Sequence, residues 1–421
     1  MSRLSRRAFA LTTVPFVLAA CLAVLMAAAR PAAAAAPDIV TPASTTDPGK
    51  AAAGWLTGQF TSGDHLESCF GADCFPDYGL TADAVFGLAS AKVGGTTTTR
   101  AASYLGANAA AYIGATDGTG PYAGSYAKLA LVAEVTGGNP AAFGGVDLLA
   151  ELRALQCPHA GCTTAEAGAF KNTLPEGGFA NDVTQSLAIL ALSRSVRAAD
   201  RAAVPAAAAF LGRQRCAPSG GFPTFFRTTG PCTSDVDATS FAVQALLAAG
   251  KRPTAAVNWL AAARQPGGGF IGNGVVNANS TGLAIQALAA AGRSTGPAQA
   301  FIATLQMRCS APVAARGAIS YDGTAKFKTA TALRATPQGI LGFTRIPLVG
   351  LTAAGAVPGA PKLACAAVPT PAPSVLGSQA DRTPELATTG TQVRPLLATG
   401  TLLILLGTGL VTAARRRRGT A

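Results

Sequence analysis

The chain has 421 residues, of which 49% are hydrophobic and only 13% are charged, and its formal net charge is +13. Nine of the positive charges lie in the two terminal segments, residues 1–36 and 386–421. These segments contain no acidic residue, so the rest of the chain carries only +4. Because the excess charge belongs to segments that resemble targeting signals, it gives no support for a nucleic acid partner.

Residues 1–36 have the order of a secretory signal peptide. A basic start precedes a long apolar run, from Ala8 to Ala29, and an alanine-rich stretch that suits cleavage. Ser5-Arg6-Arg7-Ala8-Phe9 resembles a twin-arginine signal, so export by Sec and by Tat both stay open. Cys21 could mark a lipobox, but the apolar run continues after it, which favours a small residue within the signal. We therefore expect an exported protein.

The C-terminal end carries three features in a fixed order. The pentapeptide Leu386-Ala387-Thr388-Thr389-Gly390 precedes an apolar span at residues 395–414, and Arg415-Arg416-Arg417-Arg418 follow the span. Some twenty apolar residues, at about 1.5 Å each, cross a hydrocarbon core of about 30 Å. Arginines after the span keep that end in the cytoplasm.

This arrangement resembles the Leu-Ala-x-Thr-Gly sorting signals of high-GC Gram-positive bacteria. The resemblance implies that a sortase cleaves between Thr389 and Gly390 and joins the threonine carbonyl to a peptidoglycan amine. The expected partners are therefore sortase, peptidoglycan and, before processing, the membrane through residues 395–414. A plain single-pass anchor is the alternative. Residues 366–385 contain four prolines and predict an extended linker to the cell wall.

Residues 37–365 form the expected folded domain, and about 300 of them repeat one pattern. An aromatic or aliphatic pair precedes a glutamine, a glycine-rich turn, a polar cap and an apolar helix. The clearest copy runs from Phe210 through Gln214 and Gly220-Gly221-Phe222 to Asp235 and on to Ala249. One polar residue near each apolar helix marks six copies. The markers are Asp83, Ser125, Thr184, Thr239, Thr281 and Thr336.

The helices after the caps are apolar most of the way round, as in Leu283–Ala291, so they should be buried. Six alternating outer and inner helices predict an all-α fold of six helical hairpins in two concentric rings. Two elements, Gln214 with Gly220-Gly221-Phe222 and Gln265 with Gly268-Gly269-Phe270, resemble prenyltransferase and squalene-cyclase repeats. The resemblance implies the α/α toroid of the terpenoid cyclase and protein prenyltransferase superfamily, and it predicts fold rather than activity.

One segment matches a catalytic motif. Asp235-Val236-Asp237-Ala238-Thr239 resembles the Asp-x-Asp-Asp-Thr motif of squalene-hopene-type cyclases at four of five positions, which implies Asp237 as the acid. Ala238 departs from the motif, and aromatic residues make up only 6% of the chain, whereas cyclases stabilise cations with aromatic faces. We therefore favour the interpretation that Asp235 or Asp237 caps an inner helix. The same segment resembles the inner-helix entry of cobalamin carriers, but we expect only a linker and sorting signal after Cys365.

The eight cysteines other than Cys21 predict disulfides in an exported protein. Nearest-neighbour pairing gives the bonds Cys69–Cys74, Cys157–Cys162, Cys216–Cys232 and Cys309–Cys365. The alternative is a zinc site, at Asp64-His65 with Cys69 and Cys74, or at Cys157-Pro158-His159 with Cys162. The disulfide interpretation is preferred, and we expect no metal and no cofactor.

If all six caps face one end of the toroid, the N–H groups and dipoles there favour an anionic or polar ligand, such as a wall glycan, a lipid head group or a small cofactor. The predicted rim consists of Asp182, Asp235, Asp237, Asn279, Phe222 and Phe270. The alternative role for the aromatic residues is to close the barrel end. The preferred function is a sortase-anchored surface protein whose toroid binds a ligand or partner without catalysis. The alternatives are a terpene-cyclase-like or prenyltransferase-like enzyme, a corrinoid-binding-like protein and a purely structural wall protein.

Overall fold

The computed structural model describes residues 43–366, except 173–180, 228–229 and 325. The signal peptide, nearly all of the linker and the sorting signal lie outside these residues and stay predictions. No helix in the described ranges is long and apolar enough to cross a membrane.

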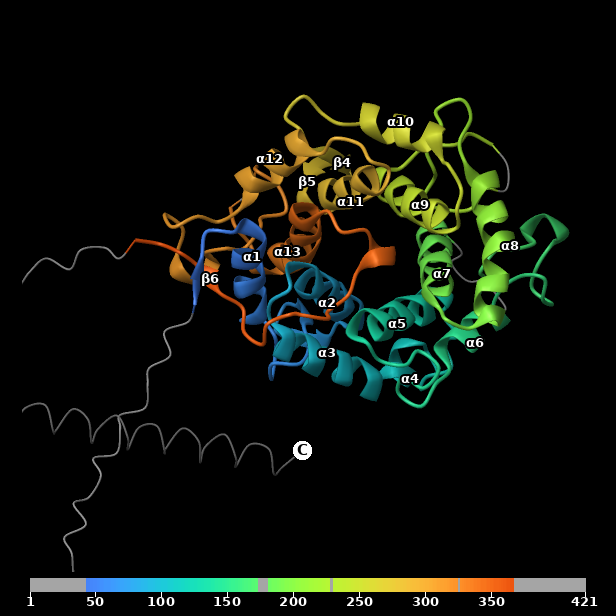
Figure 1. Ribbon diagram of the computed structural model, residues 1–421, viewed down its shortest axis with the longest axis horizontal. Coiled ribbons are helices and arrows are strands. Elements are labelled where there is room, and N and C mark those ends of the chain that lie inside the picture. The colour runs from blue at the N-terminus through green and yellow to red at the C-terminus, as the bar shows by residue number, and fades with distance from the viewer. Residues whose placement is uncertain (1–42, 173–180, 228–229, 325, 367–421) are drawn as a thin grey trace, which may run out of the picture. The chain divides into compact units, whose positions relative to one another are not determined.

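Helices dominate the described part of the chain, and most of them form six hairpins of one outer and one inner helix. The outer helices are α1 (Pro48–Thr57), α3 (Gly95–Ala107), α6 (Leu148–Ala154), α8 (Ala198–Gln214), α10 (Thr254–Ala262) and α12 (Gly296–Leu305). The inner helices are α2 (Tyr78–Ala91), α5 (Ala123–Thr136), α7 (Asp182–Arg194), α9 (Val236–Ala248), α11 (Ala278–Ala290) and α13 (Thr329–Thr344). A short helix, α4 (Ala109–Tyr112), follows α3. Figure 1 shows the two concentric rings, which confirm the predicted all-α, α/α toroid.

The inner helices pack closely because they carry alanine and glycine where they meet. A Cβ atom on Gly282 of α11 would overlap the carbonyl oxygen of Gln338 in α13. A Cβ atom on Gly87 of α2 would lie 3.1 Å from the Cα atom of Pro337. The inner helices are therefore buried most of the way round, as their lack of a polar face predicts.

The two ends of the described chain close the ring. Strand β1 (Ser44–Thr45) pairs in parallel with β6 (Lys362–Leu363), and α1 packs against both α2 and α13. Two antiparallel hairpins lie between outer and inner helices. They are β2 (Glu67–Phe70) with β3 (Asp73–Pro76), and β4 (Phe270–Gly272) with β5 (Val275–Asn277).

All four predicted disulfides are present, and they pair the cysteines as nearest neighbours along the chain. They are Cys69–Cys74, Cys157–Cys162, Cys216–Cys232 and Cys309–Cys365. The thiolates that the two zinc alternatives require are thus bonded to each other. Four disulfides are typical of an extracellular protein, because such bonds persist in oxidising compartments.

Residues 346–358, here called the strap, cover the C-terminal ends of inner helices. Arg194 at the end of α7 donates hydrogen bonds to the carbonyl oxygens of Leu348 and Leu351, both at 2.8 Å. The side chain of Gln286 donates to the carbonyl oxygen of Ile346 at 2.7 Å. The strap includes the short 3-10 helix η3 (Leu348–Gly350), which Figure 1 shows inside the ring. This end of the toroid is therefore closed by the protein's own backbone.

Candidate functional site at the mouth of the toroid

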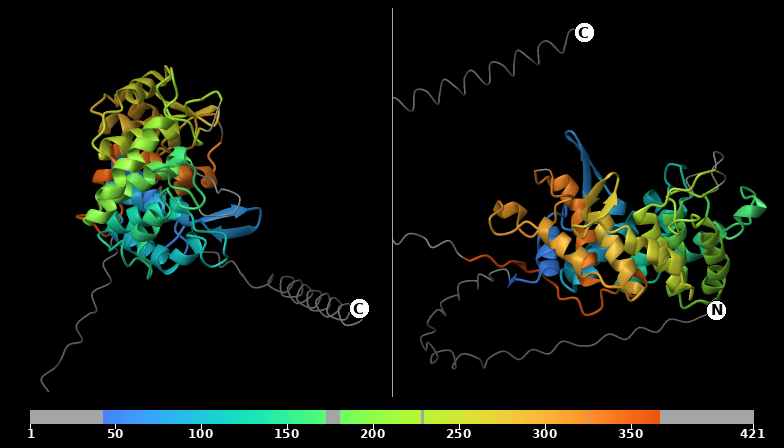
Figure 2. Two further views of the ribbon diagram at one scale, coloured as in Figure 1. Left: turned by 90° about the vertical axis from the view of Figure 1, so that its right-hand side faces the viewer. Right: turned by 90° about the horizontal axis from the view of Figure 1, so that it is seen from above.

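The N-terminal ends of the inner helices lie at the end of the toroid opposite the strap, and we call this end the mouth. The strap also bonds to the C-terminal ends of α2 and α5, through Lys92 Nζ and the carbonyl oxygen of Val135. The hairpins β2–β3 and β4–β5, which lead into α2 and α11, project on one side of the ring (Figure 2). Polar side chains from separate repeats are thereby brought together at one end.

The three polar residues of the cyclase-like motif have three different roles. Asp235 caps α9, because its Oδ1 atom accepts a hydrogen bond of 2.8 Å from the amide of Ala238. The hydroxyl of Thr239 accepts a hydrogen bond of 2.8 Å from the amide of Phe222, in the preceding turn. Asp237 lies between them and caps nothing. The interpretation that Asp235 or Asp237 caps an inner helix is confirmed, and Asp235 is the cap.

Asp237 is a largely buried carboxyl group at the start of α9. Ser280 of α11 hydrogen-bonds to it, but its Oδ1 atom has no partner among the described residues. The pKa of Asp237 is raised to about 6, mainly by burial, with the Ser280 bond opposing the shift and the nearby Asp235 adding to it. The group therefore exchanges a proton close to neutral pH.

Asp182 is the first residue of α7 and is fully buried. Its neighbour Asn181, not Asp182, caps the helix, by accepting a hydrogen bond of 2.7 Å from the amide of Thr184. Both carboxyl oxygens of Asp182 lack a partner in the described part of the chain. Burial raises the pKa of Asp182 to about 8, so the side chain is protonated at neutral pH.

Buried oxygen atoms without hydrogen-bond donors thus occur on four consecutive inner helices. They belong to Asp182 on α7, Asp237 on α9, Asn279 on α11 and Gln338 on α13. A buried polar atom without a partner costs free energy, typically about 1–3 kcal/mol. Such atoms recur at sites that are completed by a ligand or by water.

The opposite side of the mouth, at α2 and α5, is richer in donors. Lys128 Nζ lies 2.9 Å from Asp83 Oδ1. Burial lowers the pKa of Lys128, but Asp83, Tyr112 and Asp77 together outweigh it, so the pKa is raised. Tyr112 hydrogen-bonds to Ser125. A cavity of about 300 Å³ lies here. It is lined by Tyr112, Tyr122, Gly124, Ser125, Lys128, Asn172, Thr184 and Leu187.

The structure differs from the predicted rim in two ways. Phe222 and Phe270 are fully buried in the hydrophobic core and do not line the rim, because their amides bond to the inner helices and turn the rings inward. On four of the six inner helices one of the N–H groups expected to attract an anion is already bound, by the side chain of Asp77, Asn181, Asp235 or Asn277, whereas α5 and α13 have no side-chain cap. The unpartnered buried oxygens on α7, α9, α11 and α13 favour a donor of hydrogen bonds over an anion.

The Asp83–Lys128 pair and Gln338 were not predicted as site residues. Lys128 stands alone in the apolar run from Tyr126 to Val132, and a single lysine in a buried helix is a usable signal for a specific partner. The partner, Asp83, lies 45 residues away. No local pattern connects the two.

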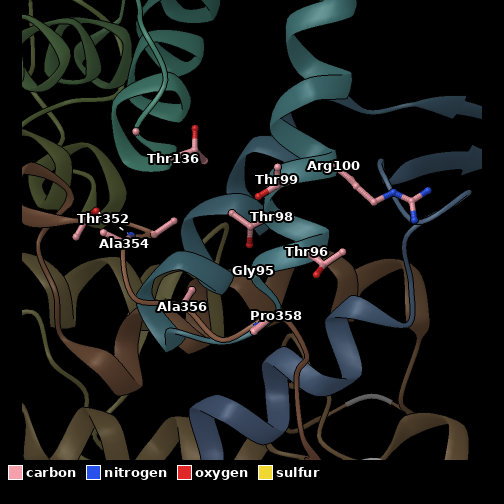
Figure 3. A pocket seen from close by; sticks show the side chains of 12 residues that line it. Gly95, Thr96, Thr98, Thr99, Arg100, Thr136, Thr352, Ala354, Ala356 and Pro358 are labelled. Atoms are coloured by element: carbon pink, nitrogen blue, oxygen red, sulfur yellow. Dashed lines mark hydrogen bonds between the residues drawn. The ribbon is translucent and has the colours of Figure 1, made fainter.

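Larger cavities lie at the strap end. One of about 510 Å³ is formed between α3, the end of α5 and the strap (Figure 3). Its polar groups are satisfied by the protein: the amide of Gly95 donates to Val357, the hydroxyl of Thr98 to Gly94, and the Arg100 guanidinium to Ser62. A second cavity, of about 550 Å³, is lined by Glu134, Ser193 and Arg194, whose buried polar atoms also lack hydrogen-bond partners among the described residues. We choose the mouth as the candidate site because its unpartnered oxygens come from four consecutive inner helices.

Comparisons with known proteins identify similar folds among solved structures. No family model matches the chain, and no curated protein matches it in sequence. An inactive variant of an alpha-1,6-mannanase from Salegentibacter sp., in complex with alpha-1,6-mannotriose, is similar with a TM-score of 0.52 and 11% identity, over 72% of this chain and 99% of that chain. Protein geranylgeranyltransferase-I of Candida albicans, complexed with GGPP, is similar with a TM-score of 0.43 and 12% sequence identity. The match covers 65% of this chain and 88% of that chain. At these identities the likeness shows the α/α toroid alone.

Proposed function

We propose that this is an exported surface protein whose toroid mouth binds an uncharged, hydroxyl-rich ligand of the saccharide class. One observation carries the proposal: buried oxygen atoms without donors lie on α7, α9, α11 and α13. A sugar presents many hydroxyl donors and could complete these bonds together. An anion such as a carboxylate offers no hydroxyl donors, and the ionised form of Asp237 would repel it.

Two further points support a saccharide. Lys128 and Tyr112 supply donors on the other side of the mouth, so a hydroxyl group can be bound there through its own oxygen. The Salegentibacter mannanase is described in complex with a trisaccharide, so a toroid of this kind can hold a sugar chain. An exported protein would also meet glycans at the cell wall.

Binding to a panel of neutral oligosaccharides, including α-1,6-mannotriose, tests the proposal. We expect the wild-type domain to bind at least one of them saturably. Asn279→Ala and Gln338→Ala should each weaken that binding about tenfold, because each removes a buried acceptor. Glu151→Gln, at an exposed position on the outer helix α6, is the control and should bind as the wild type does. If no sugar binds, or if the mouth variants bind unchanged, the proposal is wrong.

A second candidate function is acid catalysis in the same mouth, and the pKa of Asp237 favours it. A carboxyl group with a pKa of about 6 is matched to general-acid work near neutral pH. Proton donation could serve a glycosidase-like or a terpene-cyclase-like reaction. Asp237→Asn separates catalysis from binding, since the variant would retain ligand and lose turnover. Wild-type protein that converts neither a bound sugar nor a linear isoprenoid substrate would exclude this second function.

The proposed location is the cell wall, after cleavage by a sortase. The sorting signal at Leu386–Gly390 carries this part of the proposal, and it lies outside the described residues. Mass spectrometry of wall digests should find Thr389 as the last residue, joined to a peptidoglycan stem. Recovery of chains that end at Ala421 from the cytosol would contradict the location.

A further inference from the structure

The hairpin β2–β3 projects from the body of the toroid (Figure 2). It carries two exposed aromatic side chains. Phe70 is 74% exposed and Phe75 is 57% exposed. The disulfide between Cys69 and Cys74 joins the two strands where these residues pair, so the hairpin is held in one register. Exposed aromatic residues on a braced hairpin indicate an interaction surface.

Phe70 and Phe75 lie on the same face of the hairpin. Phe75 pairs with Ser68, and Ser68 and Phe70 are two residues apart on one strand. Residues directly opposite each other, and residues two apart, share a face in an antiparallel pair. The two rings are therefore diagonal neighbours on the face that also carries Ser68.

Ser68 shows where this face points. Its hydroxyl donates a hydrogen bond of 2.6 Å to Asp77, the cap of inner helix α2, and accepts one of 2.8 Å from Arg334 of inner helix α13. The face of the hairpin with Phe70 and Phe75 is thus turned toward the helix ends that form the mouth.

A third exposed aromatic residue lies at another part of the mouth. Phe225 is 59% exposed and bridges to Asn181, the cap of α7. Going round the inner ring, α7 is two helices from α2 in one direction and four in the other. The longer arc between the hairpin and Phe225 carries the unpartnered oxygens of α9, α11 and α13.

We propose that the mouth binds an extended oligosaccharide rather than a single sugar, with the chain stacking on Phe70 and Phe75 at one side and on Phe225 at the other. This inference rests on the proposed function. The apolar faces of sugar rings can stack on the exposed aromatic rings. The hydroxyl groups of the sugars can donate hydrogen bonds to the unpartnered oxygens of the mouth. Charge favours a neutral chain over an anionic lipid surface, because Asp73 shares the face of Phe70 and Glu67 stands at the base of the hairpin.

Affinity for sugars of increasing length tests this inference on the intact chain. The probes are a neutral monosaccharide, trisaccharide and hexasaccharide of the linkage selected by the wild type. We expect the wild type to bind the hexasaccharide best, and Phe70→Ala/Phe75→Ala to lose about tenfold in affinity for it with little change for the monosaccharide. The control is Val196→Ala, an exposed apolar residue after α7, at the strap end.

The outcomes separate the two proposals. Binding that does not grow with length, or a hairpin variant that binds the hexasaccharide normally, would overturn the extended-chain inference and leave the saccharide mouth standing. Absence of binding to every sugar would overturn both. A hairpin variant that loses binding to anionic phospholipid vesicles, while sugar binding stays unchanged, would show that the aromatic face serves a membrane instead.

Discussion

The amide of Phe222 donates a hydrogen bond of 2.8 Å to the hydroxyl of Thr239, and this bond ties a glycine-rich turn to the inner helix that follows it. The same bond recurs in other repeats. Backbone amides donate to threonine hydroxyl groups in three further pairs: Leu66 to Thr81, Phe270 to Thr281 and Ile319 to Thr336. In one repeat the amide of Phe170 donates instead to the side-chain oxygen of Gln185. The repeat unit is thus defined by a buried side chain that satisfies a backbone amide.

Replacing one of these threonines tests its structural role. Thr281→Val keeps the shape of the side chain and removes the acceptor of the Phe270 amide, so we expect a loss of about 1–3 kcal/mol in the free energy of unfolding. Thr304→Val on the exposed surface of α12 is the control and should cost under about 0.5 kcal/mol. Denaturant titration measures both, and equal losses would contradict the assignment.

This recurring bond shows what could be predicted from the sequence. The repeat, the six hairpins and the four disulfides follow from local patterns, because caps, turns and apolar helices are encoded within short segments. The markers were less accurate. Asp83 and Thr184 were aligned with Thr239, whereas the structure puts Thr81 and Gln185 in its place, because glutamine reaches the same amide with a longer side chain.

The features that the sequence did not predict depend on distant contacts. Asp83 meets Lys128, and the strap meets Arg194, only once the ring has closed. The inward position of Phe222 and Phe270 likewise depends on which face of each turn packs on the core.

Asp182 should make stability depend on pH. The pKa of Asp182 is about 8 in the folded protein, whereas an exposed aspartate has an ordinary pKa of 3.8, so the folded state holds a proton that the unfolded state releases. Stability should therefore fall as pH rises from about 4 to about 8, by at most about 1.4 kcal/mol per pH unit.

Asp182→Asn keeps the shape of the side chain and stays neutral, so it should remove about half of the decline between pH 6 and 8. Glu134, whose pKa burial also raises to about 8, should account for the other half. Melting temperatures of the wild type and the variant across this range measure the effect. Two parallel curves would mean that Asp182 is ionised in the folded protein.

Arg194 should hold the strap in place. It donates to three strap carbonyl groups and lies 3.2 Å from Glu134, whose pKa burial raises to about 8. Arg194→Met should cost at least about 3 kcal/mol and speed hydrogen exchange at the amides of Leu348 and Ala353. Arg213→Met removes an arginine with exposed bonds and should leave those amides protected. Unchanged exchange in the Arg194 variant would show that the strap does not depend on it.

The disulfides should differ in their effect on stability. Cys309–Cys365 closes 56 residues and fixes the C-terminal edge of the ring, whereas Cys69–Cys74 closes only five. Chain entropy predicts losses of about 4 and about 2 kcal/mol when each pair is replaced by serine. Denaturant unfolding of the two double variants under oxidising conditions measures both losses in the free energy of unfolding. A larger loss for the Cys69–Cys74 variant than for the Cys309–Cys365 variant would contradict the prediction.

The position of the bound ligand tests the account most directly. Hydrogen exchange of the intact chain, with and without the selected oligosaccharide, would show where the ligand lies. We expect slower exchange in the first turns of α7, α9 and α11 and in the hairpin β2–β3, with no change in residues 346–358. Slower exchange confined to the strap, with unchanged exchange at the mouth, would contradict the proposed ligand site.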